Sequence, residues 1–343
     1  MGFSLSDLAV ALMVSVLAAL AAEQSAMAAP ASGAGSAANP DPVEESLDDA
    51  WWTGPLLAST AATLPEGHAY VEPYLFDSLP YARFDGAGHS HAVPHQNDFG
   101  SLSYLNYGVA DPLTIGLIPR FDYDWAEDGQ SSSGIGVGDP SVQMQYRLTQ
   151  FQPGSWIPTS SINVQESLPL GRYDRLEGAS DGFGSGAWTT TFGLYLQSLY
   201  WLPNGRILRV RLDLSYALPS GVQVEGQSVY GTAIGFSGHA SRGNSTFADL
   251  AFEYSITRNW VPALDIWVER DGNTRVLGTN RQSDARDSTF AADSGTGREL
   301  IVAPALEYNW SARAGIIFGA RITAAGRNET AYVTPVAAFS YFL

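Results

Sequence analysis

The most restrictive feature of this sequence is a two-residue period of apolar and polar side chains that recurs along most of the chain. Successive side chains of a β-strand point to opposite faces, so the period predicts strands with one apolar and one polar face. In residues 113–125 the apolar row contains Leu113, Ile115, Leu117, Pro119, Phe121 and Tyr123, and the other row contains Thr114, Gly116, Ile118, Arg120, Asp122 and Asp124. Most such segments run for ~10 to 13 residues, which is enough for a tilted strand to cross a membrane.

The connections between these segments have two lengths. Short ones are expected near residues 110–112, 203–205, 258–259 and 311–312, and long ones cover about 79–97, 125–137, 170–185, 219–243 and 271–297. Short turns at one end and long loops at the other are typical of outer-membrane barrels. The predicted strands begin near His68, Asp98, Leu113, Asp139, Ile157, Gly186, Arg206, Asn244, Trp260, Arg298, Ala314 and Glu329.

A soluble β-sandwich has the same alternation, so the placement of aromatic residues is used to decide between the two folds. The strand ends next to the short turns carry Tyr107, Tyr146, Trp156, Tyr200, Tyr254, Trp260, Tyr308, Trp310 and Tyr341. Rings with a polar group prefer the boundary between hydrocarbon and water, whereas a sandwich core gives no reason to collect them at one end. We therefore predict an all-β fold, a closed antiparallel transmembrane β-barrel of about 12 strands with short periplasmic turns and long extracellular loops.

Both ends of the chain agree with export. Residues 8–22 form an apolar run, followed by the small-x-small site Ala26-Met27-Ala28, which predicts a signal peptide over residues 1–29. We expect a mobile periplasmic linker over residues 30–66 and the barrel over residues 67–343, in the outer membrane of a Gram-negative bacterium. The last strand has an outward row that we expect the barrel-assembly machinery to recognise and outer-membrane lipid to surround: Val333, Pro335, Ala337, Phe339, Tyr341 and Leu343.

Charge and cysteine content exclude several other classes. The formal net charge is −17 and all 18 basic residues are Arg, so no basic face for a nucleic acid is expected. The chain has no cysteine, which excludes disulfides and thiolate metal sites. We expect no cofactor.

Several short motifs carry a family resemblance. They are Trp51-Trp52-Thr53-Gly54-Pro55, Leu64-Pro65-Glu66-Gly67-His68, Glu72-Pro73-Tyr74, Tyr107-Gly108-Val109-Ala110-Asp111, Gly136-Val137-Gly138-Asp139-Pro140, Gln145-Tyr146-Arg147-Leu148 and Ser167-Leu168-Pro169-Leu170-Gly171. In this order they resemble the outer-membrane barrel family labelled as phenol meta-pathway (MetA) degradation proteins, over most of residues 51–343. The resemblance implies a barrel and the uptake of aromatic compounds. Its motifs mark turns and strand ends, however, and none of them is a substrate-binding motif.

The polar rows would enclose the lumen and therefore carry the candidate functional residues. Inward acids beside inward Arg would set up a field across a water-filled lumen that biases which solutes pass. Alternatively, the charges pair and fill a narrow barrel that conducts nothing. The residues predicted to line the lumen are Arg120, Asp122, Asp124, Arg147, Arg209, Arg211, Asp213, Asp249, Glu253, Asp265, Glu269, Glu299, Glu307 and Arg321, the last with an ambiguous register.

Three smaller features each have a structural and a functional interpretation. His89, His91 and His95 lie in a Gly-rich loop that is either simply solvated or a metal site. His239, with serines nearby, would be the base of a barrel hydrolase, but no Gly-x-Ser-x-Gly motif is present. Trp51 and Trp52 would either begin a plug or contact the periplasmic rim, and we favour the rim.

Our leading functional hypothesis is a passive, porin-like outer-membrane channel for small solutes, including aromatic compounds. The alternative is a non-conducting structural or adhesive barrel whose long loops bind. A barrel hydrolase is the third hypothesis, and the first two involve no enzyme activity.

Overall fold

The computed structural model of the chain describes residues 43–126, 131–281 and 287–343. The predicted signal peptide and residues 30–42 of the predicted linker lie outside the described residues. Across the described ranges, no helix is long and apolar enough to span a bilayer. Besides two short 3-10 turns, η1 (Leu47–Asp49) before the first strand and η2 (Ala179–Asp181) in a loop, the described residues form strands and loops.

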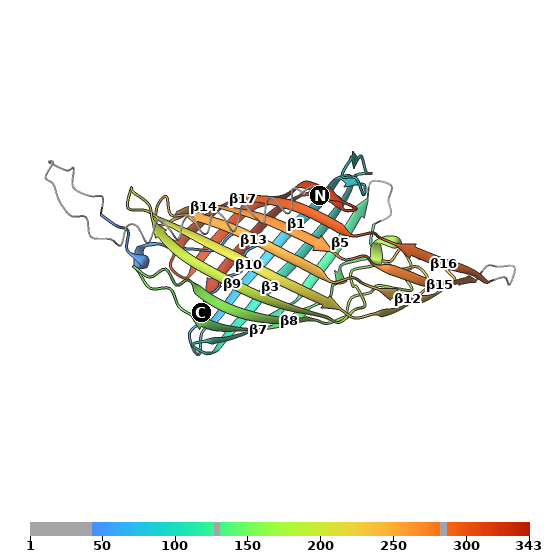
Figure 1. Cartoon of the computed structure of the whole chain (residues 1–343), viewed down its shortest axis with the longest axis horizontal. Coiled ribbons are helices and arrows are strands. Elements are labelled where there is room, and N and C mark those ends of the chain that lie inside the picture. Colours follow the sequence, from blue (N-terminus) through green and yellow to red (C-terminus); the bar gives the residue numbers. More distant parts are fainter. Residues whose placement is uncertain (1–42, 127–130, 282–286) are drawn as a thin grey trace.

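The strands form the predicted barrel (Figure 1). Each neighbour along the sheet is antiparallel, and the first strand pairs with the last, from Tyr70 opposite Phe342 to Arg83 opposite Thr330. The described residues thus build a closed antiparallel barrel of 12 strands, as the sequence predicted. The staves are β1 (Ala69–Phe84), β3 (Gln96–Ala110), β4 (Leu113–Ile118) with β5 (Arg120–Ala126), β7 (Ser141–Thr149), β8 (Thr159–Ser167), β9 (Thr189–Trp201), β10 (Ile207–Pro219), β13 (Ser245–Tyr254), β14 (Trp260–Asp271), β17 (Gly297–Ser311), β18 (Ala314–Arg327) and β19 (Thr330–Phe342).

The apolar rows lie on the outside of the barrel and end in a band of aromatic rings. On β4 and β7, Ile115, Leu117 and Met144 are exposed, while the alternate residues face inward. Trp260 lies against Tyr308 with ring centroids 4.6 Å apart, and a chain of ring contacts continues through Trp310, Phe339 and Tyr341. This band follows the short-turn end, where aromatic rings would meet the lipid–water boundary.

The connections follow the predicted two lengths with two exceptions. Residues 150–158 between β7 and β8 form a longer link at the short-turn end. The link between β18 and β19 is a tight turn at Asn328 and Glu329, although it lies at the long-loop end. Asn328 has φ +53°, a left-handed conformation that asparagine tolerates better than most residues. One strand is also interrupted, because Pro119 separates β4 from β5 and cannot donate to the ladder.

Two of the long loops form a second sheet that the sequence did not predict. Strands β11 (Val222–Glu225), β12 (Phe236–Ser241), β15 (Arg275–Arg281) and β16 (Asp287–Asp293) pair in that order. One face of this sheet packs Val224, Phe236 and Val276 around a small apolar core. The sheet projects from the barrel at the end opposite the short turns (Figure 1).

Candidate functional site in the barrel lumen

Residues 51–66 enter the lumen and occupy its periplasmic part. We call them the plug. Their hydrogen bonds reach Glu307 on β17, Asp265 on β14, Asp213 on β10 and Gln145 on β7. Glu307, Asp265 and Asp213 lie on one stretch of the barrel wall, from β17 to β10, and Gln145 lies farther round on β7. The plug therefore runs across several strands rather than following one.

The two tryptophans at the start of the plug have different surroundings. Trp51 contacts the periplasmic rim, as we had preferred, because Arg258 in the turn between β13 and β14 covers its ring at 5.1 Å. Trp52 lies against Arg209 of β10 and belongs to a plug, which the preferred interpretation did not include.

Carboxylates of the barrel wall hold the plug by its backbone. Asp265 accepts hydrogen bonds from the N–H groups of Leu56, Leu57 and Ala58, at 3.0, 3.3 and 3.1 Å. Asp213 accepts from the N–H of Ser59 at 2.6 Å. A carboxylate that accepts N–H bonds remains stable in a buried position because these donors replace water. Two inward acids therefore act as docking points for an irregular segment.

The plug fits because the barrel wall has glycine, with no side chain, where the plug enters and where it leaves. At the entry, the side chain of Thr53 occupies the space that a Cβ atom on Gly315 would need. At the exit, a Cβ on Gly108 would overlap the carbonyl oxygen of Pro65. Glycine at these positions lets the Thr53 side chain and the Pro65 backbone approach the strands closely.

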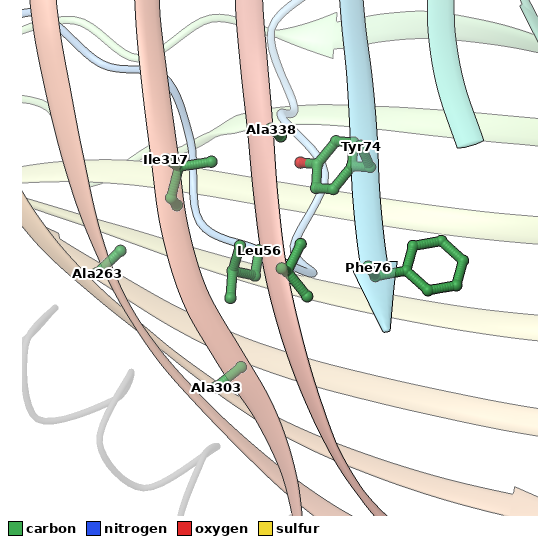
Figure 2. Close-up of a cluster of buried hydrophobic side chains, with 8 residues drawn as sticks. Leu56, Tyr74, Phe76, Ala263, Ala303, Ile317 and Ala338 are labelled. Carbon is green, nitrogen blue, oxygen red and sulfur yellow. The ribbon is translucent and has the colours of Figure 1, made fainter. Parts of the chain in front are cut away.

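The middle of the plug contributes an apolar contact. Leu56 lies among inward side chains of β1, β14, β17, β18 and β19 (Figure 2). Several of these side chains are alanines, which leave room for the larger leucine. The residues in contact form the cluster Tyr74, Phe76, Ala263, Ala303, Ile317, Val336 and Ala338.

Upstream of the plug, Glu45 fastens the chain to the periplasmic rim. Its carboxylate accepts from Arg206 at 3.0 Å and from Ser255 at 2.9 Å. Its carbonyl oxygen accepts from the indole N–H of Trp201 at 2.9 Å. The plug is thus fixed on both sides, by this anchor and by its covalent continuation into β1.

Beside the plug, two arginines converge on one buried carboxylate. Arg209 Nε donates to Glu253 at 2.7 Å, and Arg211 Nε lies 3.0 Å from the same carboxylate. Arg211 also donates to the carbonyl oxygen of Ala58 in the plug at 2.9 Å. Arg209 covers the ring of Trp52 at 4.5 Å. This part of the lumen is therefore filled by paired charges and the plug.

A cavity of about 320 Å³ remains between the plug and the opposite wall. Its lining combines tyrosine rings with a few polar groups, among them Glu72, Asn106 and Gln143. Enclosed sites with aromatic walls and few polar groups suit small, weakly polar molecules. The tyrosines are Tyr70, Tyr74, Tyr104 and Tyr195.

On the loop side of the plug lies a larger vestibule of about 900 Å³. Its lining contains seven carboxylates against two arginines, so it is strongly negative. One of the two arginines, Arg120, is already paired, because it forms a bidentate salt bridge with Asp122 at 2.9 and 3.0 Å. Tyr104 lines both the vestibule and the smaller cavity, and therefore marks the boundary between them.

The loop after β8 forms part of the vestibule wall. Asp139 accepts hydrogen bonds from Gly171 at 2.9 Å and from the N–H and hydroxyl of Ser185, both at 2.7 Å. Farther out, Asp181 accepts from the N–H of Ser133 at 2.7 Å, and this bond is the main cause that lowers the pKa of the Asp181 carboxyl.

The residues predicted to line the lumen fall into three groups in the structure. Arg209, Arg211, Asp213, Asp249, Glu253, Asp265 and Glu307 are buried around the plug. The vestibule is lined by Arg120, Asp122, Asp124 and Glu269, and Glu299 lies opposite Glu269 on the neighbouring strand. Arg321 lies over the ring of Phe76 at 5.2 Å, which resolves its register as inward, and Arg147 lies near the short turns opposite Ser161.

Sequence reasoning missed other lining residues. Glu72 and its neighbours Tyr70 and Tyr74 belong to an inward row of β1 that is as apolar as the outward row, so alternation gave no signal. Asp98 and Asp271 lie at strand ends, where loop and strand composition merge. The plug itself is short of charge and rich in small residues, and this composition was the available clue.

The loop histidines gather around an acid and not around one another. His91 Nε2 lies 3.1 Å and His89 Nδ1 lies 3.4 Å from Asp85 Oδ2. The hydrogen bond to His91, followed by the backbone N–H of His89, lowers the pKa of Asp85. Within the described part of the chain, no group of three or more His, Asp or Glu side chains could hold a metal ion. His239 lies on the projecting sheet, where its Nδ1 faces Gln223 at 3.5 Å.

The closed barrel with an inward polar wall defines the class of protein as an outer-membrane-type β-barrel. The structure is similar to that of an outer membrane channel from Pseudomonas putida F1, with a TM-score of 0.63, 14% identity, and coverage of 84% of this chain and 100% of that one. The β domain of the Bordetella autotransporter BrkA matches with a TM-score of 0.41 and 10% identity, over 80% of this chain and 98% of that one. No curated protein sequence matches the chain.

A sequence family identifies the chain more closely. The family model described as "Putative MetA-pathway of phenol degradation" matches residues 95–334. The chain belongs to this family, as the motifs had indicated.

Proposed function

We propose that the protein is a channel in the outer membrane of a Gram-negative bacterium, and that it admits small, weakly polar solutes, aromatic ones included. The single observation that supports this most is the pair of cavities, of about 900 and 320 Å³, whose linings share Tyr104. The vestibule and the tyrosine-lined cavity therefore adjoin at this side chain. The family description, which names phenol degradation, agrees with this choice of solute.

Passage in this proposal requires the plug to move. The plug is docked by hydrogen bonds from four consecutive backbone N–H groups, which can re-form with water once the segment leaves the wall. We further propose that lipid surrounds the outward rows and that the assembly machinery recognises β19.

Planar bilayers test the channel directly. The purified protein should give discrete current steps, and phenol added on the loop side should interrupt them briefly as it occupies the tyrosine-lined cavity. Replacing Tyr104 with alanine should shorten each interruption. Tyr123→Ala should not, because Tyr123 lies in the outward row of β5. The absence of any current steps at every voltage would overturn the channel proposal.

A covalent lock tests whether the plug moves. The chain has no cysteine, so Thr53→Cys with Gly315→Cys adds an isolated pair at two positions in contact. The oxidised pair should hold the channel in its low-conductance state, and a reductant should release it. Equal currents in both redox states, with Thr53→Cys alone as the control, would contradict a moving plug.

A binding role for the projecting sheet is a second candidate. Strands β11 and β16 form its two edges. Glu225 on β11 already bonds to Asp174 and Arg175, so β16 is the edge that can add a strand from another chain. Deleting residues 222–241 together with 275–293 should abolish adhesion to host or neighbouring cells and leave the current steps unchanged if this role holds.

A further inference from the structure

Three arginines lie side by side on the outward face of the barrel, at the long-loop end. Arg270 on β14 lies directly opposite Arg298 on β17, and Arg298 lies opposite Arg327 on β18. Glu269 and Asp271, on either side of Arg270, line the vestibule, so Arg270 and its two partners in the ladder face away from the lumen. We call these three residues the arginine row. Like charges directly opposite each other on neighbouring strands repel, so the row is unfavourable unless an anion lies beside it.

For two members of the arginine row, the described chain supplies no such anion. Among the described residues, Arg270 and Arg327 form no salt bridge with an acid. Other exposed arginines differ, because Arg175 pairs with Glu225 and Arg258 pairs with Asp49. The chain has 35 acids against 18 arginines, so composition does not account for a purely basic group. The arginine row therefore indicates a negatively charged partner outside the described chain.

The arginine row borders a hollow of about 300 Å³. The other lining residues are Gly86 in the loop after β1, Thr296 in the loop before β17, and Asn328 in the β18–β19 turn. Asn328 Nδ2 donates to the carbonyl oxygen of Thr296 at 3.0 Å, which joins the turn to the loop. Guanidinium groups bind phosphate through two parallel hydrogen bonds, and a threonine hydroxyl can add a third. The chemistry of the hollow thus suits a phosphate group.

The length of β17 places the arginine row at one surface of the membrane. The outward row of β17 is apolar from Leu300 onward and reaches Tyr308, ten positions after Arg298. Ten residues of strand, with a rise of about 3.4 Å each and a tilt of about 40°, span roughly 25 Å across the bilayer, which is the height of the apolar band of an outer-membrane barrel. Tyr308 belongs to the aromatic band at the short-turn end. The arginine row therefore lies at the level of the lipid head groups on the opposite surface.

Next to the arginine row, the outward surface becomes apolar at once. Leu300 on β17 lies between Val268 on β14 and Ala325 on β18, and Val302 lies opposite Ile266 at the next level. An occupant with its phosphate in the hollow would have this apolar surface alongside it within the bilayer. A molecule with both a phosphate and hydrocarbon chains matches the two surfaces, whereas a free anion matches only the first.

We propose that the arginine row and its hollow bind a phosphate group of the glycolipid of the outer leaflet, a phosphorylated sugar that carries several acyl chains. The long-loop end of an outer-membrane barrel faces the outside of the cell, where this lipid forms the surface. The inference rests on the proposed outer-membrane location and not on conduction. A protein that gives no current can therefore still have this lipid site.

Native mass spectrometry of the purified protein tests the site. Lipid A with two phosphates should bind one molecule per barrel more tightly than any other lipid added, and lipid A without phosphates should bind several-fold more weakly. Arg327→Gln should weaken the binding of phosphorylated lipid A about fivefold, because one arginine at an anionic lipid surface contributes roughly that factor. The matched control is Arg313→Gln, which removes an exposed arginine from the turn at the other end of β17 and β18 and should change nothing.

A second variant on another strand protects the test against misfolding. Arg270→Gln should weaken binding to a similar degree. If Arg270→Gln and Arg327→Gln both match the control, or if lipid A binds equally well without its phosphates, the site is overturned. Equal affinity for phosphatidylglycerol, or displacement of lipid A by inorganic phosphate at the same concentration, would show only a general attraction for anions and would also overturn the proposal.

Discussion

The two halves of the lumen contain the same kinds of residue but use them differently. In the periplasmic half, Arg209, Arg211 and Glu253 pair with one another, and Asp265 binds the plug backbone. In the extracellular half, acids outnumber arginines by seven to two and surround about 900 Å³ of open space. The contrast shows that inward charge alone does not make a pore or a packed core. The presence of a segment that supplies backbone N–H groups decides between them.

Removing the plug should make the two halves alike and should have the largest effect. We expect a variant in which residues 52–64 are replaced by a short Gly-Ser linker to conduct several-fold more current per channel, because the filled half becomes water-accessible. Single-channel recording measures this. Unchanged step sizes would mean that the plug does not limit the current.

Breaking the charge pairing of the periplasmic half should reduce stability. Glu253→Gln leaves two buried guanidiniums without their common carboxylate, and loss of one partner of a buried ion pair typically costs about 3 to 5 kcal/mol. Urea unfolding in lipid vesicles, followed by tryptophan fluorescence, measures the free energy of unfolding. The comparison variant is Glu225→Gln in the exposed pair with Arg175, where no measurable change is expected.

Weakening the docking of the plug should have an intermediate effect. Asp265→Asn keeps one acceptor oxygen but loses the charge that binds three N–H groups, and hydrogen bonds to charged groups contribute roughly 1.5 to 3 kcal/mol each. We expect more frequent transitions to the higher-conductance state without a change in its size. Asp111→Asn, at the exit of the plug, is a milder control because Asp111 binds only Glu66 through its side chain among the bonds described.

The smallest effect should come from pH in the vestibule. Burial, with the neighbouring Asp271 and Glu299, raises the pKa of Glu329 in the β18–β19 turn to about 7. The carboxyl is charged above this pH and neutral below it, so lowering the pH from about 8 to about 6 removes negative charge and should slightly reduce cation preference. Glu329→Gln should flatten this pH dependence. An identical pH profile in the variant would show that other groups titrate.

The same shift has a defined sign for stability. The ordinary pKa of this carboxyl is 4.5, so the folded protein holds an extra proton between about pH 4.5 and about pH 7. The stabilising contribution of Glu329 is therefore complete below 4.5 and is lost as the pH rises through 7.

Much of the barrel was predictable because a membrane imposes a simple rule on every strand. Leu208 and Leu214 must face lipid and Arg211 must not, and this rule alone determines the register of β10. The ring contacts from Trp260 to Tyr341 follow from the same constraint at the boundary of the bilayer. Arg321 was ambiguous because its neighbours Gly319 and Ala320 are small on both faces.

The plug and the projecting sheet were not predictable in the same way. No periodicity marks the segment around Gly54 and Ser59, because its backbone is irregular and several of its partners, Asp213 among them, are more than 150 residues away. The strands of the second sheet have 4 to 7 residues, too few for alternation to separate them from loops. The inward orientation of the β1 tyrosines could not be predicted, because Tyr74 and Leu75 are both apolar enough to face lipid.

The position of the plug in the chain orders the events of folding. Thr53 emerges among the earliest residues of the described chain, yet its N–H bonds to Glu307, 254 positions later. That contact cannot form until β17 is present, and closure by β1 and β19 must leave the segment on the inner side. The plug can therefore take its final place only after most of the barrel wall has been synthesised, although it is the first part of the described chain to be made.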